Sequence, residues 1–207
     1  LHEFLPRVDE LEIKRATSGL TAEEQKLLDA AESWSEFNPM LGTRGVRLGV
    51  VKPGLYAMQV RALLDAAIAL RKAGKNPIVE VMIPLTVTRE ELALARSWVE
   101  EGIAVATKGV RRPPDVTIGT MIETPRAALR ADEIAEFADF FSFGTNDLTQ
   151  MTFGFSRDDV ESRMMPAYLE QGLLKRNPFE TIDQSGVGEL VHLAAQRGRK
   201  IKRDLKL

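Results

Sequence analysis

Near the middle of the chain stands the stretch Thr117-Ile118-Gly119-Thr120-Met121-Ile122-Glu123-Thr124-Pro125-Arg126, an apolar run that ends in a carboxylate and then breaks into a turn. A second run of the same kind follows it, Phe140-Phe141-Ser142-Phe143-Gly144-Thr145-Asn146-Asp147-Leu148-Thr149-Gln150. A buried strand that delivers a carboxylate at its carboxyl end is how a (β/α) barrel builds a metal-dependent site. The two runs therefore predict neighbouring parallel strands that bring Glu123 and Asp147 to one edge of a sheet.

Outward from these runs, strands and helices alternate. Strands are predicted over 78–83, 116–122 and 139–143, and a short apolar piece covers 46–51. Capping boxes at Thr21/Glu24 and Thr88/Glu91 predict helices that extend to about Ser35 and Thr107. Further helices are expected after Pro53-Gly54, over 125–137, from near Asn146, and over 186–197. Short strands without polar alternation, separated by helices, indicate an α/β protein with a parallel sheet.

The chain is expected to form one domain over 1–207, in three parts. A helical segment covers 1–37, strand–helix repeats cover 38–155, and a loop–helix excursion with a covering helix occupies 156–207. The first residue is not Met, and a strand-like pattern begins just before Leu207. We therefore expect both ends to be cut from a longer protein.

Composition excludes some classes of function. The net charge is −2, with 44% hydrophobic and 28% charged residues, so neither nucleic acid nor an anionic membrane is an expected partner. No stretch is long and apolar enough to span a bilayer. The chain has no cysteine, which rules out disulfides. The lack of a recognisable targeting segment favours a cytoplasmic protein.

Each of the two carboxylates has a simpler interpretation. Glu123 and Asp147 could cap the helices that begin just after them, as Pro125 in a first helical turn suggests. Their pairing favours a metal site, because carboxylates at neighbouring strand ends repel unless a cation lies between them. Magnesium prefers such oxygen ligands and keeps waters or substrate oxygens in its shell.

Polar neighbours could complete the site. Asn146 could bind a phosphate or carboxylate oxygen, or could simply be a turn residue. Arg44, which stands between Thr43 and Gly45 near a second glycine, could hold a phosphoryl group or form a surface salt bridge. Arg157 could be a second anion contact, or could pair with an adjacent aspartate. Arg126 is interpreted as structural.

These residues resemble a known family, the phosphoenolpyruvate/pyruvate-binding domain of pyruvate, phosphate dikinase. The similarity runs through nearly the whole chain and includes several segments shared with phosphoenolpyruvate synthase and enzyme I of the sugar phosphotransferase system. Two segments, 152–159 and 183–191, favour the dikinase. The matching segments are Phe37 to Gly42 with Arg44-Gly45, Glu80 to Leu85, Gly119 to Glu123, and Phe140 to Gln150.

The resemblance implies a (β/α)8 barrel with Mg²⁺ bound by Glu123 and Asp147. It also implies that Arg44 contacts the transferring phosphoryl group and that substrate is bound by Arg44, Glu123, Gly144, Thr145, Asn146 and Asp147, with Arg44 and Asn146 acting in catalysis. In the family, a phosphohistidine on a separate domain gives its phosphoryl group to pyruvate enolate, or the reverse. The whole enzyme converts ATP, phosphate and pyruvate to AMP, diphosphate and phosphoenolpyruvate.

The chain also departs from the family. Thr43 and Val46 replace a histidine and a cysteine beside the arginine, while a further arginine segment before Leu1 and a cysteine segment after Leu207 are missing. The family pattern implies about four of eight barrel strands, so we expect a partial barrel, inactive alone, that associates through its free strand edges as a homo-oligomer, such as a dimer. The alternatives are a phosphoenolpyruvate synthase-like transferase and a non-catalytic fragment that binds oxyacids or a partner.

Overall fold

The computed structural model describes residues 6–207, so the first five residues of the predicted segment 1–37 lie outside the described residues. The chain divides into two compact units at Thr43/Arg44. The first unit contains helices α1 (Val8–Thr17) and α2 (Ala22–Ser33), and a short 3-10 helix, η1 (Pro39–Leu41). The predicted capping box begins α2, because Thr21 Oγ1 accepts from the Glu24 N–H at 3.2 Å and Glu24 accepts from the Thr21 N–H at 2.9 Å.

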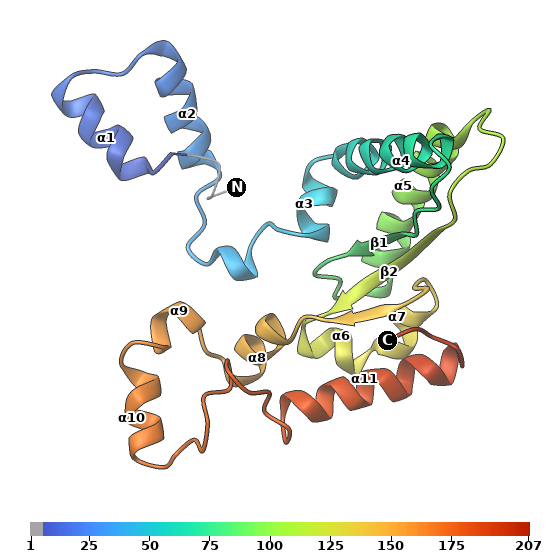
Figure 1. The fold of residues 1–207 in the computed structure, drawn as a ribbon. Helices are drawn as coiled ribbons and strands as arrows, with labels where there is room; N and C mark the ends of the chain where they lie inside the picture. The colour runs from blue at the N-terminus through green and yellow to red at the C-terminus, as the bar shows by residue number, and fades with distance from the viewer. Residues whose placement is uncertain (1–5) are drawn as a thin grey trace. The chain divides into compact units, whose positions relative to one another are not determined.

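A parallel sheet organises the second unit (Figure 1). Its strands are β1 (Val79–Ile83), β2 (Val116–Ile122) and β3 (Phe141–Phe143), in the order β1-β2-β3. All three strands run in the same direction, so their carboxyl ends lie along one edge of the sheet. The helices are α3 (Val46–Val51), α4 (Leu55–Lys72), α5 (Arg89–Thr107), α6 (Pro125–Leu129), α7 (Ala131–Ala135), α8 (Thr145–Phe153), α9 (Arg157–Val160), α10 (Met164–Glu170) and α11 (Val187–Ile201).

Helices cover one face of the sheet. Alternate strand residues, among them Ile83, Ile118, Ile122 and Phe141, are buried in a core shared with α4, α5, α7 and α11. The opposite face carries residues that remain exposed, including Glu80, Met82 and Thr117. The predicted α/β class is therefore confirmed, with a sheet that is covered on one side.

The prediction of about four strands is wrong for the described residues, which form a sheet of three. The apolar piece 46–51 is helix α3, and its buried residues Val46 and Gly49 stand three apart, as on one face of a helix. At the other end of the chain, Lys206 forms an isolated parallel bridge with Phe140, and its carbonyl accepts from the Phe141 N–H at 2.9 Å. The predicted strand-like pattern before Leu207 thus lies beside β3 as a bridge only.

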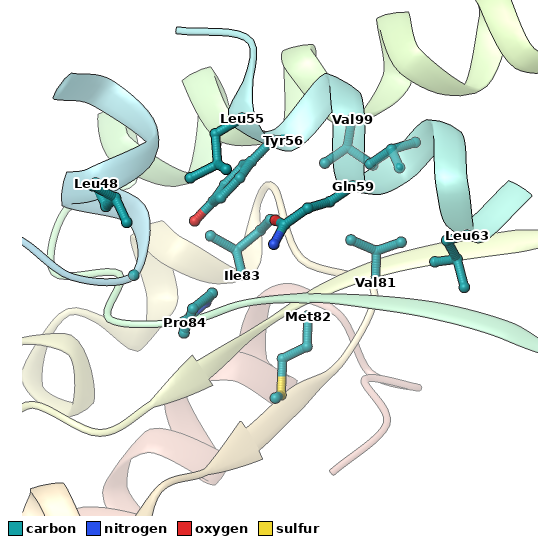
Figure 2. Close-up of a pocket in the computed structure, with 12 residues that line it drawn as sticks. Leu48, Leu55, Tyr56, Gln59, Leu63, Val81, Met82, Ile83, Pro84 and Val99 are labelled. Atoms are coloured by element: carbon teal, nitrogen blue, oxygen red, sulfur yellow. The ribbon is translucent and has the colours of Figure 1, made fainter. Parts of the chain in front are cut away.

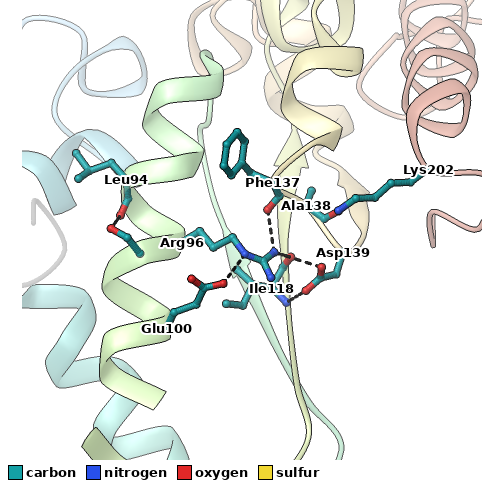
Figure 3. A network of polar contacts seen from close by, with 9 residues as sticks. Leu94, Arg96, Glu100, Ile118, Phe137, Ala138, Asp139 and Lys202 are labelled. Atoms are coloured by element: carbon teal, nitrogen blue, oxygen red, sulfur yellow. Dashed lines mark hydrogen bonds and ion pairs between the residues drawn. The ribbon is translucent and has the colours of Figure 1, made fainter. Parts of the chain in front are cut away.

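A polar network fixes the amino-terminal ends of β2 and β3 (Figure 3). Arg96 of α5 donates to the Phe137 carbonyl at 2.9 Å and pairs with Asp139 at 3.2 Å. The second carboxylate oxygen of Asp139 accepts from the Ile118 N–H at 2.8 Å. Because one aspartate bridges a helix and both strands, the network sets the alignment of β2 with β3 and, through it, the position of their carboxyl ends.

Among residues 6–207, no helix combines the length and the apolar character needed to cross a membrane.

Candidate functional site

The carboxyl ends of the three strands place the predicted site residues together. Glu123 directly follows β2, Gly144 directly follows β3, and Pro84 directly follows β1. The Gly144 N–H donates to the Ile122 carbonyl at 3.1 Å, which holds the ends of β2 and β3 side by side. Asp147 lies in the first turn of α8, just beyond the end of β3.

Glu123 does not cap the next helix. The N-cap of α6 is Thr124, whose hydroxyl accepts from the Ala127 N–H at 3.2 Å. Glu123 is instead 5% exposed, and its Oε1 accepts from the backbone N–H of Leu85 at 2.6 Å. Burial raises the pKa of the Glu123 carboxyl, the Leu85 hydrogen bond opposes this rise, and the nearby Asp147 charge adds to it. The Asp147 carboxylate therefore lies within electrostatic reach of Glu123.

Asp147 does not cap α8 either, because the N-cap of that helix is Gly144 and no side chain bonds to it. The Asp147 side chain is buried. Its Oδ1 accepts from the Asn146 amide at 3.3 Å, whereas its buried Oδ2 accepts no hydrogen bond and lies 3.1 Å from the Arg44 guanidinium. Asp147 Oδ2 therefore retains lone pairs for a further ligand.

Arg44 reaches this edge from the segment before α3. Its side chain, 43% exposed, pairs with Asp147 rather than with a surface acid. Gly45, which follows it, has φ 56° and ψ −134°, a backbone conformation that glycine tolerates and other residues avoid. The Val46 N–H then donates to the Pro84 carbonyl at 3.1 Å, which anchors the arginine segment to the end of β1.

Arg157 belongs to the same cluster. It pairs with Glu161 at 2.9 Å rather than with the adjacent aspartates, and its Nη1 donates to the Asn146 side-chain oxygen at 3.2 Å. The Arg157 backbone N–H donates to Gln150 at 2.8 Å. Asn146 is therefore held on one side by Arg157 and on the other by Asp147.

Arg126, which the sequence analysis interpreted as structural, donates to the Val87 carbonyl at 2.6 Å.

Gly144 has a steric role in this cluster. A Cβ atom at this position would lie 2.6 Å from Oε2 of Glu123 and 2.7 Å from Sδ of Met121. Contacts this short are forbidden, so only glycine lets the Glu123 carboxylate lie against the backbone here. The neighbouring Thr145 and Asn146 are exposed and begin α8.

The oxygen atoms available here suit a hard cation that leaves several of its coordination positions to other ligands. Glu123 and Asp147 supply carboxylate oxygens, the ligand type that Mg²⁺ prefers, and Asp147 Oδ2, which accepts no hydrogen bond, is a candidate ligand atom. Within residues 6–207 there is no cluster of three or more His, Cys, Asp or Glu side chains that could hold a metal by itself. A cation bound here would need substrate or water oxygens in the rest of its shell.

One contact that sequence patterns did not predict comes from an apolar residue. Leu85 serves Glu123 through its backbone N–H, and no property of its side chain signals this contact. The buried hydroxyls of Thr86 and Thr120, which hydrogen-bond to one another at 2.8 Å below the site, were missed as well.

A groove of about 350 Å³, lined in part by Gly45 and Pro84, lies between α4 and the outer edge of β1 (Figure 2). Its lining includes Leu48, Tyr56, Gln59 and Met82 and contains no charged side chain. The groove therefore has nothing to balance the charge of an oxyacid, in contrast to the cluster of Arg44, Glu123 and Asp147.

Comparison with known proteins identifies the family of the chain. The family described as PEP-utilising enzyme, PEP-binding domain, where PEP is phosphoenolpyruvate, matches residues 14–203. The chain belongs to this family of PEP-utilising enzymes. Its relatives include pyruvate, phosphate dikinase 2 of Zea mays, 51% identical, the enzyme of the same name in Oryza sativa, 49% identical, and pyruvate, phosphate dikinase of Rhizobium meliloti, 48% identical.

Each of these alignments covers 100% of the chain but 23% of the relative. The chain thus corresponds to less than a quarter of a pyruvate, phosphate dikinase. Other dikinases of similar identity, from Oryza sativa and Zea mays, are named as chloroplastic. The predicted cytoplasmic location is therefore not confirmed.

Proposed function

We propose that this chain is the substrate-binding part of a pyruvate, phosphate dikinase, where a phosphoryl group passes between a phosphohistidine and pyruvate enolate. The contact that supports this most directly is Arg44 at 3.1 Å from the buried Asp147, beside Glu123 and at the end of a parallel sheet. The similarity to named dikinases along the whole chain supports this reaction among those of PEP-utilising enzymes.

Glu123 and Asp147 are the proposed ligands of Mg²⁺, and the bound ion would neutralise the charge of the enolate and phosphoryl oxygens. Arg44 then stabilises the transferring phosphoryl group, since a guanidinium can donate to two of its oxygens. Asn146 donates its amide to substrate, and Gly144 with Thr145 provides backbone close to it. Arg157, which holds Asn146, is a second cationic group on the same side.

In the proposed reaction the P–N bond of the phosphohistidine breaks and a P–O bond forms to the enolate oxygen of pyruvate. The enolate arises when the pyruvate methyl group loses a proton. The chain has no cysteine, and no side chain assigned above is placed to take that proton. Turnover therefore requires groups outside this chain, along with the phosphohistidine domain, and the chain alone is proposed to bind substrate without completing the cycle.

The sheet is proposed to be part of a (β/α)8 barrel. Two observations support this: all strands are parallel, and helices cover one face while Glu80, Met82 and Thr117 stay exposed on the other. In a barrel that second face points inward. The outer edge of β1 has no partner strand among the described residues, so a homo-oligomer, such as a dimer that pairs free edges, is proposed for the isolated chain.

The test of the function is a thermal shift with Mg²⁺ and oxalate, a mimic of pyruvate enolate. The two together should raise Tm of the wild-type chain, and Glu123→Ala or Asp147→Ala should remove the rise. As a matched control, Asp65→Ala removes an exposed acid that pairs with Arg61 on α4, and it should leave the shift unchanged.

Other outcomes would favour the alternatives. An oxalate shift that needs neither acid would indicate a non-catalytic oxyacid-binding fragment. A phosphoenolpyruvate synthase-like enzyme would be indicated if the full-length protein made phosphoenolpyruvate from ATP and pyruvate without needing phosphate.

A further inference from the structure

Leu85 is held in a conformation that its side chain disfavours. Its φ is 59°, and among residues 6–207 it is the one non-glycine residue with positive φ. The residue is fully buried. For a bulky side chain this region of backbone space is unfavourable, and such a residue persists only where the surrounding structure over-determines it.

Contacts on both sides of Leu85 hold the turn. The buried Thr120 hydroxyl, on β2, donates to the Ile83 carbonyl at 2.8 Å and hydrogen-bonds to Thr86 at 2.8 Å. Beyond Thr86, the Val87 N–H donates to Glu91 at 2.7 Å, and the Val87 carbonyl accepts from Arg126 at 2.6 Å. The backbone before and after Leu85 is therefore tied to β2, α5 and α6.

The Leu85 N–H points from this turn toward the site. That N–H donates to Oε1 of Glu123 at 2.6 Å, within the buried edge of the site. A carboxylate with one oxygen fixed by a backbone donor can rotate little, so its other oxygen keeps its place over Gly144. The donor belongs to the main chain of a buried residue, which makes its position more rigid than a long side chain could provide.

The same turn also holds the arginine segment. The Pro84 carbonyl accepts from the Val46 N–H at 3.1 Å. A Cβ atom on Gly45 would lie 2.9 Å from both the Pro84 carbonyl oxygen and Cβ of Leu85, so Gly45 packs directly on the turn. Arg44, which precedes Gly45, pairs with Asp147. One turn thus contacts the backbone that carries Arg44 and the side chain of Glu123.

We propose that the turn Pro84-Leu85-Thr86 is the positioning element of the site, in which the strained Leu85 fixes Glu123 through its N–H while Pro84 fixes the backbone that carries Arg44. The inference rests on the proposed function, because it assigns the turn a role in cation binding by Glu123. Leu85 touches neither cation nor substrate, and so it is a positioning residue.

A purely structural turn would behave differently. Weakening it would lower the stability of the whole unit and leave the affinity of the folded protein for a cation unchanged. A positioning turn alters the affinity of the folded protein, as do other groups that orient metal ligands. Cation affinity at a temperature where every variant is folded therefore separates the two roles.

The experiment measures Mn²⁺ binding by the full chain, using electron paramagnetic resonance of the free ion, with Tm recorded for each protein without metal. In the first variant, Leu85 is replaced by its α-hydroxy acid, which exchanges the N–H for an oxygen and keeps the side chain. We expect Kd for Mn²⁺ to rise by roughly 10-fold, the lower end of the range for groups that orient metal ligands.

The second variant keeps the proposal testable if the first does not fold. Thr86→Val removes the hydroxyl that anchors the turn and should also raise Kd for Mn²⁺. Thr86→Ser retains the hydroxyl and should bind Mn²⁺ with the wild-type Kd. Thr107→Val is the matched control. It removes a hydroxyl that donates to the Ile103 carbonyl within α5, away from the turn, and Kd should stay at the wild-type value.

Three results decide the question. Weaker Mn²⁺ binding by the Leu85 ester or Thr86→Val, with wild-type binding by Thr86→Ser and Thr107→Val, supports the proposal. Equal binding by all of these variants, while Glu123→Ala abolishes binding, overturns the positioning role and leaves the proposed function standing. No binding by the wild-type chain, or undiminished binding by Glu123→Ala, overturns the proposed function and the positioning role with it.

Discussion

The guanidinium of Arg44 lies 3.1 Å from the carboxylate of Asp147, the acid proposed to bind the cation. Without a cation, the arginine provides the positive charge that a buried carboxylate needs. A metal ion at Asp147 would compete with the guanidinium for the same oxygen, Oδ2, which accepts no hydrogen bond. Under the proposed function, a cation bound there would leave the Arg44 guanidinium available for the phosphoryl group.

Replacing Arg44 should therefore have opposite effects on two ligands. Arg44→Met removes the competing charge, so the affinity for Mn²⁺ alone should rise by up to about fivefold, because a half-exposed ion pair contributes about 1 kcal/mol or less. The same change should weaken the binding of oxalate in the presence of Mg²⁺, because the anion loses its guanidinium. Isothermal titration measures both affinities.

The control is Arg61→Met, which removes an exposed arginine that pairs with Asp65 on α4 and should change neither affinity. A loss of Mn²⁺ affinity in Arg44→Met would contradict the competition and would assign Arg44 to the support of Asp147.

Gly144→Ala should disable the site while the fold remains. The added Cβ would come within 2.6 Å of Oε2 of Glu123 and 2.7 Å of Sδ of Met121, so the carboxylate must move. Overpacking of this kind costs about 1–3 kcal/mol, and the thermal shift with Mg²⁺ and oxalate should disappear. Gly188→Ala in α11, whose Cβ would approach no atom closer than 3.4 Å, should retain the shift. A full shift in Gly144→Ala would show that Glu123 has more freedom than the contacts indicate.

Tyr56→Phe should not destabilise the protein, although it deletes a hydroxyl from the core. The Tyr56 hydroxyl is buried without a hydrogen-bond partner, and burial raises the pKa of the phenol to about 12. Removing an unsatisfied polar atom can gain roughly 1 kcal/mol, which corresponds to a Tm increase of about 2–4 °C at this chain length. Calorimetry compares the variant with wild type.

Tyr168→Phe provides the control, and it also leaves Tyr56 as the remaining tyrosine of the two in the chain. Alkaline titration of that variant, followed by ultraviolet absorbance, should give a midpoint near 12 while the protein stays folded. A lower Tm for Tyr56→Phe would indicate that the hydroxyl has a partner.

Local signals predicted much of the fold. Capping boxes at Thr21 and Thr88 located the starts of α2 and α5, because each pairs a hydroxyl with a glutamate three residues later. The apolar run 116–122 coincides with β2. The piece 46–51 could not be assigned in this way, since a short, mostly apolar segment fits a strand or a helix equally well until its packing is known.

Sequence patterns pointed to the candidate site only through its side chains. Glu123 and Asp147 stand out because acids are rarely buried unless they are paired, and each follows an apolar run. Leu85 gives no such signal, because its contact with Glu123 is made by a backbone N–H across a sequence separation of 38 residues. Arg157 suggested a local pair with its neighbouring aspartates, yet the helical turn of α9 places Glu161 against it instead. Tertiary contacts of this kind require the folded chain.

The first unit should lose stability in acid through Glu24. Hydrogen bonds from Lys14, and then from Thr21, lower the pKa of the Glu24 carboxyl to about 2. The folded state therefore favours the charged carboxylate of Glu24. The stabilising effect of that carboxylate is complete above the usual pKa of 4.5 and is lost as the pH falls through about 2.

Urea unfolding followed by Trp34 fluorescence, in a Trp98→Phe background, reports on this unit. Glu24→Gln should be less stable than its parent at pH 6 and equal to it near pH 2, while Glu23→Gln, which leaves the capping contacts intact, should show no such convergence. A difference between Glu24→Gln and its parent that stays constant over this pH range would rule out Glu24 as the titrating group.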